Sequence, residues 1–489
     1  MIKEENSKSV HELLYEKLIL NNKNGFSKIS EEEENSEQNE TKKMKIDSIN
    51  NFCKDYKIFL KKSKTERETV DEVVKLLTDE GFRALENLDT LNSGDKIYSV
   101  NRGKGVLSAV IGSEPLEKGI SIIGAHVDVP RLDLKPNPLF EEHGNAYLKT
   151  HYYGGIKKYQ WLAIPLAIHG TIVKQDGAKI KICIGENEEE PVFCITDLLP
   201  HLAHDQMQKK MNEAINGEIL NVLVGNIPHE EKKVKDRVKF NTLKLINEKY
   251  NIVEEDFLSC EIEIVPAFNP RDLGFDRSMI AAYGHDDRVC TYAACRAIID
   301  AKEPPKTAVC ILVDKEEVGS LGNTGMQSRF FEDKIAKIIS LKEKSYSDLM
   351  LRDTFSKSIC LSADVGVAYD PNFPEVFEER NTSIINGGVM LSKYTGSRGK
   401  SGASDASAEL VARIRNIFNK NGVIWQMGGF GKVDIGGGGT IAAYVANLNI
   451  DTIDCGVPLF SMHAPYEIAG KFDIFMAYKG YKAFYEDKD

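Results

Sequence analysis

The adjacent carboxylates Glu316 and Glu317 are the residues whose types and spacing point most directly to chemistry. They follow Ala308–Val313, an apolar and β-branched run that predicts a strand buried on both faces. Open α/β sheets bind their ligands at the carboxyl ends of the strands. Since adjacent like charges repel, a divalent ion would stabilise the pair by binding one carboxylate, leaving the other as a general base. The alternative is a solvated, charged loop that only follows a strand.

Side chains of metal-ligand type also occur at the boundaries of other predicted elements, namely at His126, Asp286, Asp364 and His463. The run Ile120–Ala125 predicts a strand that ends just before His126, and the run Ile359–Ser362 predicts one that ends just before Asp364. Asp286 lies at the start of a predicted helix, and His463 follows a strand near the C-terminus. Because parallel strands bring their carboxyl ends to one edge of a sheet, we expect these side chains to meet there.

Imidazoles and carboxylates together suit a pair of divalent ions, and the nitrogen ligands favour zinc. Ions about 3.5–4 Å apart need a shared anion between them, and Asp286, short and fixed at a helix start, is the predicted bridge. Asp128 follows His126 by two residues on the same predicted strand, so both side chains face the same way. Asp128 is therefore expected to accept the imidazole N–H of His126. Glu316 then remains to take a proton from an attacking water, and Glu317 to bind metal.

Each of these positions also has a purely structural interpretation. A His-x-Asp pair such as His126-Val127-Asp128 commonly closes a turn, and Asp286-Asp287 can cap a helix and interact with its dipole. Asp364 can cap the loop that follows its strand. The metal hypothesis therefore depends on the whole set of boundaries rather than on any one of them. Gly436–Gly439 lacks the Lys-Ser/Thr of a phosphate-binding loop, so nucleotide binding is not expected.

The composition sets outer limits on the fold and the partners. With 489 residues, 42% of them hydrophobic and 28% charged, the chain is long enough for two domains or for one with a large insertion. The net charge of -11 argues against a nucleic-acid partner. A charged N-terminus and the lack of an apolar run of about 20 residues argue against a secretory signal and a membrane span.

The cysteines favour a reducing compartment. There are nine, an odd number, and none forms a Cys-x-x-Cys pair. Several lie in apolar runs and are interpreted as small core residues, namely Cys183, Cys194, Cys310 and Cys360. We therefore expect a cytoplasmic location.

Strands alternate with helices up to about residue 130 and again after Pro270. This pattern predicts a mixed, largely parallel sheet covered by helices on both faces. Between these parts, short β-type runs separated by polar turns predict an inserted, mainly antiparallel module over residues 131–267. A weak amphipathic pattern in residues 1–25 predicts one helix, and Ser30–Lys43, without apolar residues, predicts an exposed, mobile linker. A further helix is expected over Asp405–Asn419, capped by Ser404 or Asp405.

Several motifs occur in a characteristic order: GAHVDVPRLDLKPNPLFE, YYGGIKKYQWLAIPLAIHG, GHDDRV, DKEEVGS, SADVG, GGGGTIA and SMHAPYE. In this order they resemble the aspartyl-aminopeptidase family of dinuclear zinc metallopeptidases, from about Thr65 to the C-terminus. The resemblance implies an α/β fold in which residues 1–130 and 268–489 form a three-layer α/β/α zinc-peptidase domain. Residues 131–267 would be the inserted β-rich dimerisation domain, and the dimers would assemble into a tetrahedral dodecamer.

The resemblance also implies roles for individual residues. Two divalent ions per subunit would be held by His126, Asp286 as the bridge, Glu317, Asp364 and His463, with Glu316 as the base. A histidine of the inserted domain would reach into the active site of a partner subunit, and the matching position is His169. The alternative for His169 is a histidine held within its own sheet.

The substrate preference stays open between acidic and neutral residues. Family members selective for acidic substrates carry a histidine shortly after the SAD motif, where this chain has Tyr369-Asp370. The basic segment that matches the substrate pocket offers Lys393, Arg398 and Lys400. Lys393 is the predicted substrate-binding residue among them, and these side chains would pair either with an acidic substrate or with solvent.

These observations predict a cytoplasmic metalloaminopeptidase that removes N-terminal residues from peptides. Zinc is the expected metal, with cobalt and manganese as alternatives, and no nucleic-acid or membrane partner is expected. Two other functions remain: a dinuclear zinc deacylase or carboxypeptidase on a similar scaffold, and a catalytically silent cargo or assembly protein. The complete set of predicted ligands and base argues against the silent protein, because such a protein could lose any of them.

Overall fold

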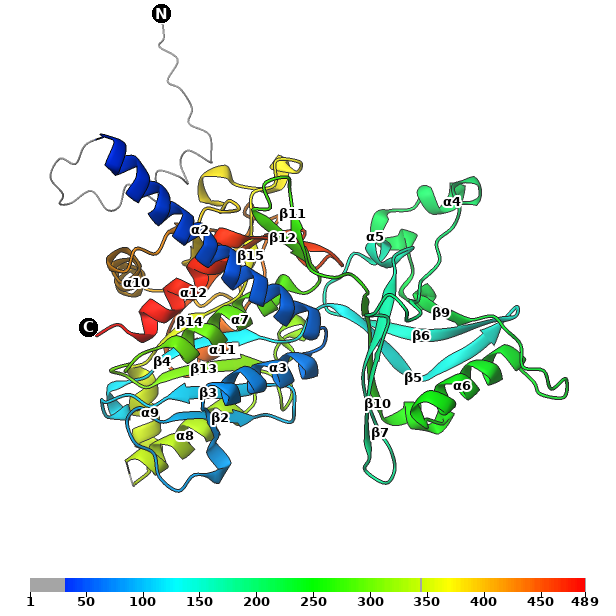
Figure 1. Ribbon diagram of the computed structural model, residues 1–489, viewed down its shortest axis with the longest axis horizontal. Coiled ribbons are helices and arrows are strands. Elements are labelled where there is room, and N and C mark those ends of the chain that lie inside the picture. The colour runs from blue at the N-terminus through cyan, green and yellow to red at the C-terminus, as the bar shows by residue number, and fades with distance from the viewer. Residues whose placement is uncertain (1–30, 344, 489) are drawn as a thin grey trace, which may run out of the picture.

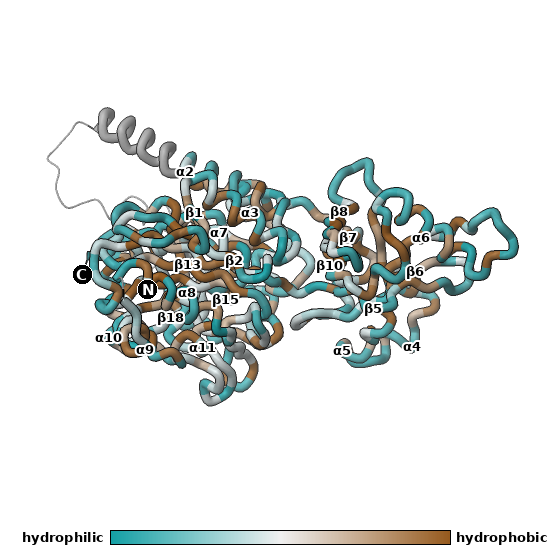
Figure 2. The backbone as a smooth tube through the Cα atoms, turned by 90° about the horizontal axis from the view of Figure 1, so that it is seen from below, coloured by the Kyte–Doolittle hydropathy of each residue, from teal (hydrophilic) through white to brown (hydrophobic). Residues whose placement is uncertain are grey.

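The computed structural model describes residues 31–343 and 345–488, with side chains from residue 46 onward. The helix predicted in residues 1–25 lies outside this range. The described chain forms two lobes, a larger α/β lobe and a smaller, mainly antiparallel β lobe (Figure 1). Figure 2 shows hydrophobic segments inside each lobe and hydrophilic loops at the outer ends. No helix in the described part of the chain is long and apolar enough to cross a membrane.

The larger lobe is built on a nine-stranded sheet with the strand order β1-β2-β3-β13-β4-β14-β18-β16-β17. Its strands are β1 (Arg83–Ala84), β2 (Lys96–Val100), β3 (Val106–Val110), β4 (Ser121–His126), β13 (Ala308–Val313), β14 (Ile359–Ser362), β16 (Val389–Ser392), β17 (Trp425–Met427) and β18 (Asp451–Gly456). The central strands β13, β4, β14 and β18 run parallel to one another. Their carboxyl ends therefore meet at one edge of the sheet, as the sequence predicts.

Helices cover both faces of this sheet. Its helices are α2 (Glu31–Lys62), α3 (Glu66–Asp79), α7 (His285–Asp300), α8 (Phe330–Lys342), α9 (Asp348–Ser356), α10 (Ala408–Lys420), α11 (Ala442–Ala446) and α12 (Lys471–Tyr485). Alternate residues of β13 pack into two different hydrophobic cores: Ala308, Cys310 and Leu312 into one, and Val309, Ile311 and Val313 into the other. The first core includes α2, α3, α7, α10 and α12, and the second includes α8, α9 and α11. The lobe is thus a three-layer α/β/α structure.

A smaller five-stranded sheet lies beside this core, with the order β11-β12-β20-β19-β15. Its strands are β11 (Arg271–Leu273), β12 (Met279–Ala282), β15 (Gly366–Val367), β19 (Pro458–Phe460) and β20 (Glu467–Gly470). The segment between β12 and α7 and the turn between β19 and β20 lie next to the carboxyl edge of the large sheet. The small sheet therefore brings residues from two distant parts of the chain to that edge.

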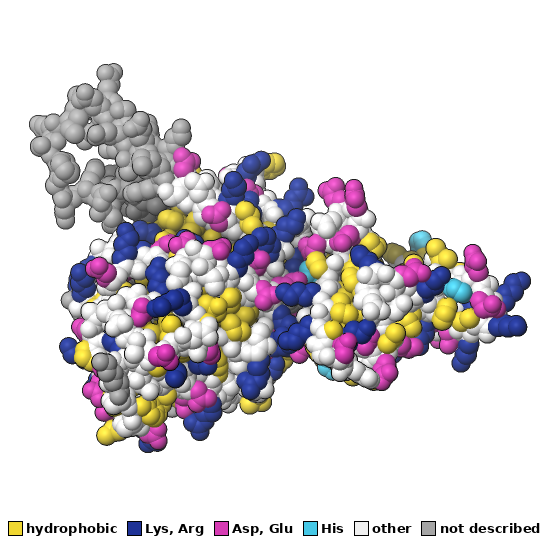
Figure 3. Space-filling model, turned by 60° about the horizontal axis from the view of Figure 1, so that its bottom comes forward, with side chains coloured by type: hydrophobic (Ala, Val, Ile, Leu, Met, Phe, Trp, Pro, Cys, Tyr) yellow, Lys and Arg dark blue, Asp and Glu magenta, His cyan; other side chains and the backbone are white. Residues whose placement is uncertain are grey.

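The second lobe contains a six-stranded antiparallel sheet with the order β8-β7-β10-β5-β6-β9. Its elements are β5 (Arg131–Glu142), β6 (Asn145–Tyr153), β7 (Leu166–Val173), β8 (Lys179–Ile184), α4 (His204–Met207), α5 (Met211–Ala214), β9 (Asn221–Gly225), α6 (Arg237–Tyr250) and β10 (Cys260–Pro266). It has a hydrophobic core of its own, separate from the cores of the larger lobe. Figure 3 shows basic and acidic side chains interspersed on the visible face, including the place where the lobes meet.

Three expectations from the sequence need correction. The segment from residue 31 to 43 is part of α2 instead of an irregular linker, because Glu, Gln and Lys are good helix formers and the later turns of α2 are anchored by buried Tyr56 and Leu60. Helix α10 begins at Ala408, and its cap is Ser407, whose side chain accepts the N–H of Leu410. Cys183 is exposed because it lies on β8, an edge strand, and Cys194 is partly exposed in the loop that follows β8.

Candidate active site

The predicted ligands are brought together by neighbouring strand ends. His126 is the last residue of β4 and pairs in register with Val313, the last residue of β13. Glu316 and Glu317 lie in a 3-10 turn just beyond β13, and Asp364 lies two residues beyond β14. Asp286 in the first turn of α7 and His463 in the turn between β19 and β20 complete the group.

Asp286 lies at the centre of this cluster. Its Oδ1 is 3.1 Å from Nε2 of His126, and its Oδ2 is 3.1 Å from Nε2 of His463. Glu317 approaches on the side of His463, with its Oε2 3.5 Å from that Nε2 atom. Asp364 approaches on the side of His126, at 3.9 Å between Oδ1 and Nε2. The carboxylate of Asp286 thus separates two groups of potential metal ligands.

Hydrogen bonds fix which nitrogen of each imidazole faces the cluster. The Nδ1 of His463 lies 2.9 Å from the carbonyl oxygen of Gly155. The Nδ1 of His126 lies 3.0 Å from the backbone carbonyl oxygen of Asp128 and 3.3 Å from its Oδ1. When both Nδ1 atoms donate, both Nε2 lone pairs face Asp286, which is the orientation that metal ligation requires. Asp128 therefore has the position predicted for it beside His126.

Asp128 also holds the turn that carries the two glutamates. Its Oδ1 accepts the backbone N–H of Glu316 at 3.1 Å, and its Oδ2 accepts that of Glu317 at 3.2 Å. The Asp128 side chain is fully buried, so it cannot exchange these donors for water. One carboxylate therefore links the orientation of an imidazole to that of the predicted base.

The charges of the cluster fit divalent cations. Burial raises the pKa of Glu317 and of Asp364 well above the ordinary range, and nearby carboxylates, Asp286 among them, raise both further. Burial and the carboxylates of Asp128 and Asp286 likewise raise the pKa of Glu316 to about 7. Oε1 of Glu317 is buried and has no hydrogen-bond partner among the described residues. A set of imidazoles and carboxylates with unbalanced negative charge is the donor set of a metal site.

A cavity of about 520 Å³ opens directly onto the cluster. Its wall includes Asp286, Glu316, Glu317, Asp364 and His463. Beyond them lie apolar side chains: Val365, Val367, Met390, Phe430 and Met462. Among the residues that the structure describes, no Lys or Arg side chain lines this cavity.

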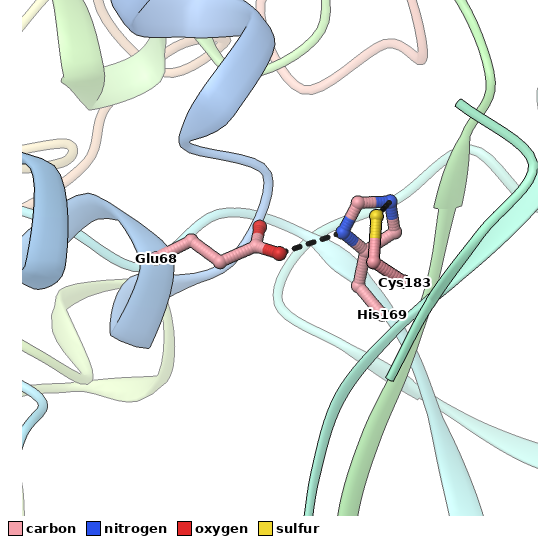
Figure 4. Close-up of side chains that lie close together, drawn as sticks. All are labelled: Glu68, His169 and Cys183. Atoms are coloured by element: carbon pink, nitrogen blue, oxygen red, sulfur yellow. Dashed lines mark hydrogen bonds and ion pairs between the residues drawn. The ribbon is translucent and has the colours of Figure 1, made fainter. Parts of the chain in front are cut away.

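Two predicted substrate residues lie elsewhere in the single chain. The Nζ of Lys393 is 2.9 Å from Oδ1 of Asp405, and neither residue lines the cavity. His169 lies on β7 at the junction of the lobes, where Glu68 points toward its ring and Cys183 lies beside it (Figure 4). Its Nδ1 is 2.8 Å from Oε1 of Glu68. The expected reach of His169 into a partner subunit stays a prediction.

Sequence reasoning missed two acidic residues that organise the ligands. Glu467 is buried and accepts the backbone N–H of His463 at 2.7 Å and that of Asp286 at 3.1 Å. Asp287 accepts the backbone N–H of His126 at 3.2 Å. Glu467 lies in the SMHAPYE motif, and its spacing of four residues from His463 was the signal available in the sequence.

Comparisons with known proteins agree with this geometry. Residues 59–485 match the family described as aminopeptidase I zinc metalloprotease (M18). A relative from Clostridium acetobutylicum, named "Probable M18 family aminopeptidase 1", is 52% identical over 433 residues, or 88% of this chain and 93% of the relative. The crystal structure of an M18 aminopeptidase from Thermotoga maritima superimposes with a TM-score of 0.88 at 46% identity, covering 90% of this chain and 97% of the other.

A more distant structure, an Ape1 dodecamer from S. cerevisiae, shares the fold with a TM-score of 0.72 at 24% identity, covering 88% of this chain and 96% of the other. The bacterial relatives match nearly their whole length, and the family match includes both the strand ends that carry the cluster and the inserted lobe. The chain therefore belongs to the aminopeptidase I zinc metalloprotease (M18) family, and it is a metalloaminopeptidase.

Proposed function

We propose that the enzyme holds two divalent ions, zinc by preference, on either side of Asp286. His126 and Asp364 would complete one site, and His463 and Glu317 the other. The single observation that carries this proposal is the position of the Asp286 carboxylate between the two Nε2 atoms, at 3.1 Å from each. When bound, the ions supply Lewis-acid chemistry, polarising the scissile carbonyl and lowering the pKa of the attacking water.

Glu316 is the proposed general base. It lines the cavity beside the ligands, and its backbone N–H is held by Asp128. It would accept a proton from the attacking water and return it to the amine that leaves. A pKa raised to about 7, mainly by burial, suits a carboxylate that takes and gives back a proton near neutral pH.

The apolar part of the cavity wall supports a preference for neutral, apolar N-terminal residues. This part is formed by side chains such as Met390, Phe430 and Met462. Two of the three basic side chains expected to bind an acidic residue are engaged elsewhere, since Lys393 and Lys400 both pair with Asp405 at 2.9 Å. An acidic side chain entering this cavity would lose hydration without gaining a cationic partner.

We further propose that residues 1–130 and 268–489 are the catalytic domain and that residues 131–267 are a dimerisation domain. Exposed apolar side chains gather on the inserted lobe, at Leu198, Leu199, Leu202, Met207, Met211 and Ile219. Such side chains suit burial between copies of the chain. The dodecamer known for the yeast relative supports assembly of dimers into the same kind of particle. The free cysteines support a cytoplasmic location.

The test is release of free amino acid from a series of X-Ala dipeptides by the full-length enzyme, with and without a chelator and added zinc. We expect chelator-sensitive release that is fastest for X = Leu or Met and slow for X = Asp or Glu. Faster release of Asp or Glu would contradict the apolar preference. Cleavage of N-acetylated peptides in place of free ones would indicate the deacylase alternative.

The matched variant for this test is Glu316→Gln, which keeps the shape of the side chain but not its basicity. Loss of a general base costs about 10²- to 10⁴-fold in kcat. We expect a loss of that size with unchanged metal content and unchanged particle size on a sizing column. Wild-type kcat in this variant would contradict the assignment of Glu316.

A further inference from the structure

We propose that Tyr153, at the end of β6 in the inserted lobe, is a positioning residue of the active site that acts through Asp128; the proposal rests on the function proposed above. The following glycines, Gly154 and Gly155, belong to the same contact region. We refer to these three residues as the Tyr153–Gly155 segment. Through this segment the inserted lobe of each chain forms part of the catalytic site of the same chain.

The hydroxyl of Tyr153 completes the hydrogen bonding of Asp128. It donates to Oδ2 of Asp128 at 2.7 Å. That carboxylate already accepts the backbone N–H groups of Glu316 and Glu317 and contacts the Nδ1 of His126. A carboxylate offers about four acceptor positions, and Tyr153 supplies the one side-chain hydroxyl among the donors to this carboxylate in the described residues. Without it, the buried Asp128 side chain would lack a donor and would be held only by the groups it has to orient.

The ring of Tyr153 is itself held from the other side by a buried cation. The guanidinium of Arg131 lies 4.0 Å from the centroid of the ring. Arg131 is fixed in turn, because its Nε lies 2.8 Å from Oδ1 of Asp133 and 3.2 Å from Oε2 of Glu263. All three of these charged residues belong to the six-stranded sheet. The inserted lobe therefore supplies most of the contacts that position the Tyr153 hydroxyl, and Glu66 of α3 adds one more, 3.6 Å from Nη1 of Arg131.

The two glycines bring the same segment against the other half of the ligand cluster. The carbonyl oxygen of Gly155 lies 2.9 Å from Nδ1 of His463 and sets the orientation of that ring. A Cβ atom on Gly154 would lie 3.4 Å from Cβ and Oε2 of Glu317. Gly154 has φ +72°, a conformation that disfavours any other residue. The segment thus contacts Glu317 and His463 on one side of Asp286 directly, and it reaches His126 on the other side through Asp128.

The expected effect of removing the hydroxyl is on turnover rather than on substrate binding. Tyr153 does not line the cavity that receives the substrate. Partners that orient metal ligands change metal affinity or activity by about 10- to 100-fold when they are lost. We therefore expect Tyr153→Phe to lower kcat by about 10- to 100-fold, to leave KM for Leu-Ala nearly unchanged, and to weaken metal retention against a competing chelator.

The matched control is Tyr152→Phe, which removes the hydroxyl of the preceding, exposed tyrosine on the same strand. We expect wild-type kinetics and metal retention for this control. The second readout is the visible absorption spectrum of the cobalt-substituted proteins, which should change in Tyr153→Phe and not in Tyr152→Phe. This spectrum needs no substrate, so it tests the role of Tyr153 independently of activity. If the wild-type enzyme released no amino acid from any dipeptide, that result would overturn only the proposed function.

A double-mutant cycle with Asp128→Asn tests whether Tyr153 acts through Asp128. We expect Tyr153→Phe to cost much less kcat in the Asp128→Asn background than in the wild-type background. Independent, multiplicative losses would overturn the proposal. It would also be overturned by wild-type kcat and an unchanged cobalt spectrum in Tyr153→Phe, or by equal losses in Tyr153→Phe and Tyr152→Phe.

Discussion

The molecule contains two clusters in which histidines lie among carboxylates, and they differ in their balance of charge. In the catalytic cluster, Asp286 lies between His126 and His463, and no Lys or Arg side chain of the described residues lines the adjoining cavity. At the junction of the lobes, His169 lies between Glu68 and Glu186, whose Oε1 is also 3.6 Å from Nζ of Lys64. The ligand types are alike, but the second cluster also contains a lysine.

The titration of the two clusters follows this difference. Burial alone would raise the pKa of Glu186, but His169 and Lys64 bring it below its ordinary range. In the catalytic cluster the pKa of Glu317 is raised well above that range by burial and by Asp286. His463 and His126 lower the pKa of Glu317 but do not offset burial and Asp286. A bound cation would therefore stabilise the charged form of Glu317, whereas Glu186 already has its cations. Excess negative charge, and not the presence of His, Glu and Cys side chains, therefore distinguishes the proposed metal centre from the junction.

The largest expected effect follows from removing the carboxylate between the two histidines. Asp286→Ala takes the shared ligand from both proposed sites, so we expect both ions to be lost and kcat to fall by more than about 100-fold. Metal content of the purified protein by atomic absorption checks this. The matched change at the junction, Glu186→Gln, should leave the metal content unchanged. Retention of two ions per chain by Asp286→Ala would contradict the assignment of Asp286 as the ligand shared by both proposed metal sites.

A smaller effect is expected on stability when the junction loses its histidine. Burial alone would lower the pKa of His169, but hydrogen bonds to Cys183, Glu186 and Glu68 raise it to about 11. This pKa is above the value of about 6.5 in an unfolded chain. The stabilisation from protonated His169 is therefore complete below about pH 6.5 and is lost as the pH rises toward 11.

His169→Asn should accordingly reduce the free energy of unfolding by about 1.5–3 kcal/mol near neutral or slightly acidic pH, the range for hydrogen bonds to charged groups. The difference from wild type should shrink at alkaline pH. Urea unfolding of both proteins at about pH 6 and about pH 9.5 measures it. A difference that grows with pH would show that His169 is neutral in the folded protein.

The smallest effect is expected for the thiol at the junction. Cys183 lies 3.9 Å from Nε2 of His169 and is exposed (Figure 4). If the junction binds no metal, Cys183→Ser should leave the metal content and kcat unchanged and shift stability by no more than about 0.5 kcal/mol. Loss of one bound ion in this variant would show that the junction is a metal site after all.

The sequence was sufficient where local patterns decide the structure. The strands Ala308–Val313 and Ile359–Ser362 have the predicted bounds, because an apolar run flanked by polar residues defines a buried strand. Parallel strands then bring their ends together, so the meeting of His126 with Asp364 could be expected before the structure was known.

Other features depend on contacts that no local pattern reveals. The carbonyl of Gly155 orients His463, and these residues are 308 positions apart in the chain. The start of α2 was missed because an acidic, low-complexity stretch resembles a linker until the buried turns that follow it are known. The position of Lys393 was likewise open, since its pairing with Asp405 depends on the course of a long loop.

The strand order of the large sheet also determines when this enzyme can become active during synthesis. Strand β4 lies between β13 and β14, both of which leave the ribosome only after the whole inserted lobe has been made. The inserted lobe has its own core and can fold first, as domains generally do during translation. His126 is then synthesised well before Asp286 and His463, the residues with which it forms the cluster. A nascent chain that has not yet reached His463 lacks one of the proposed metal ligands, so we expect it to be inactive.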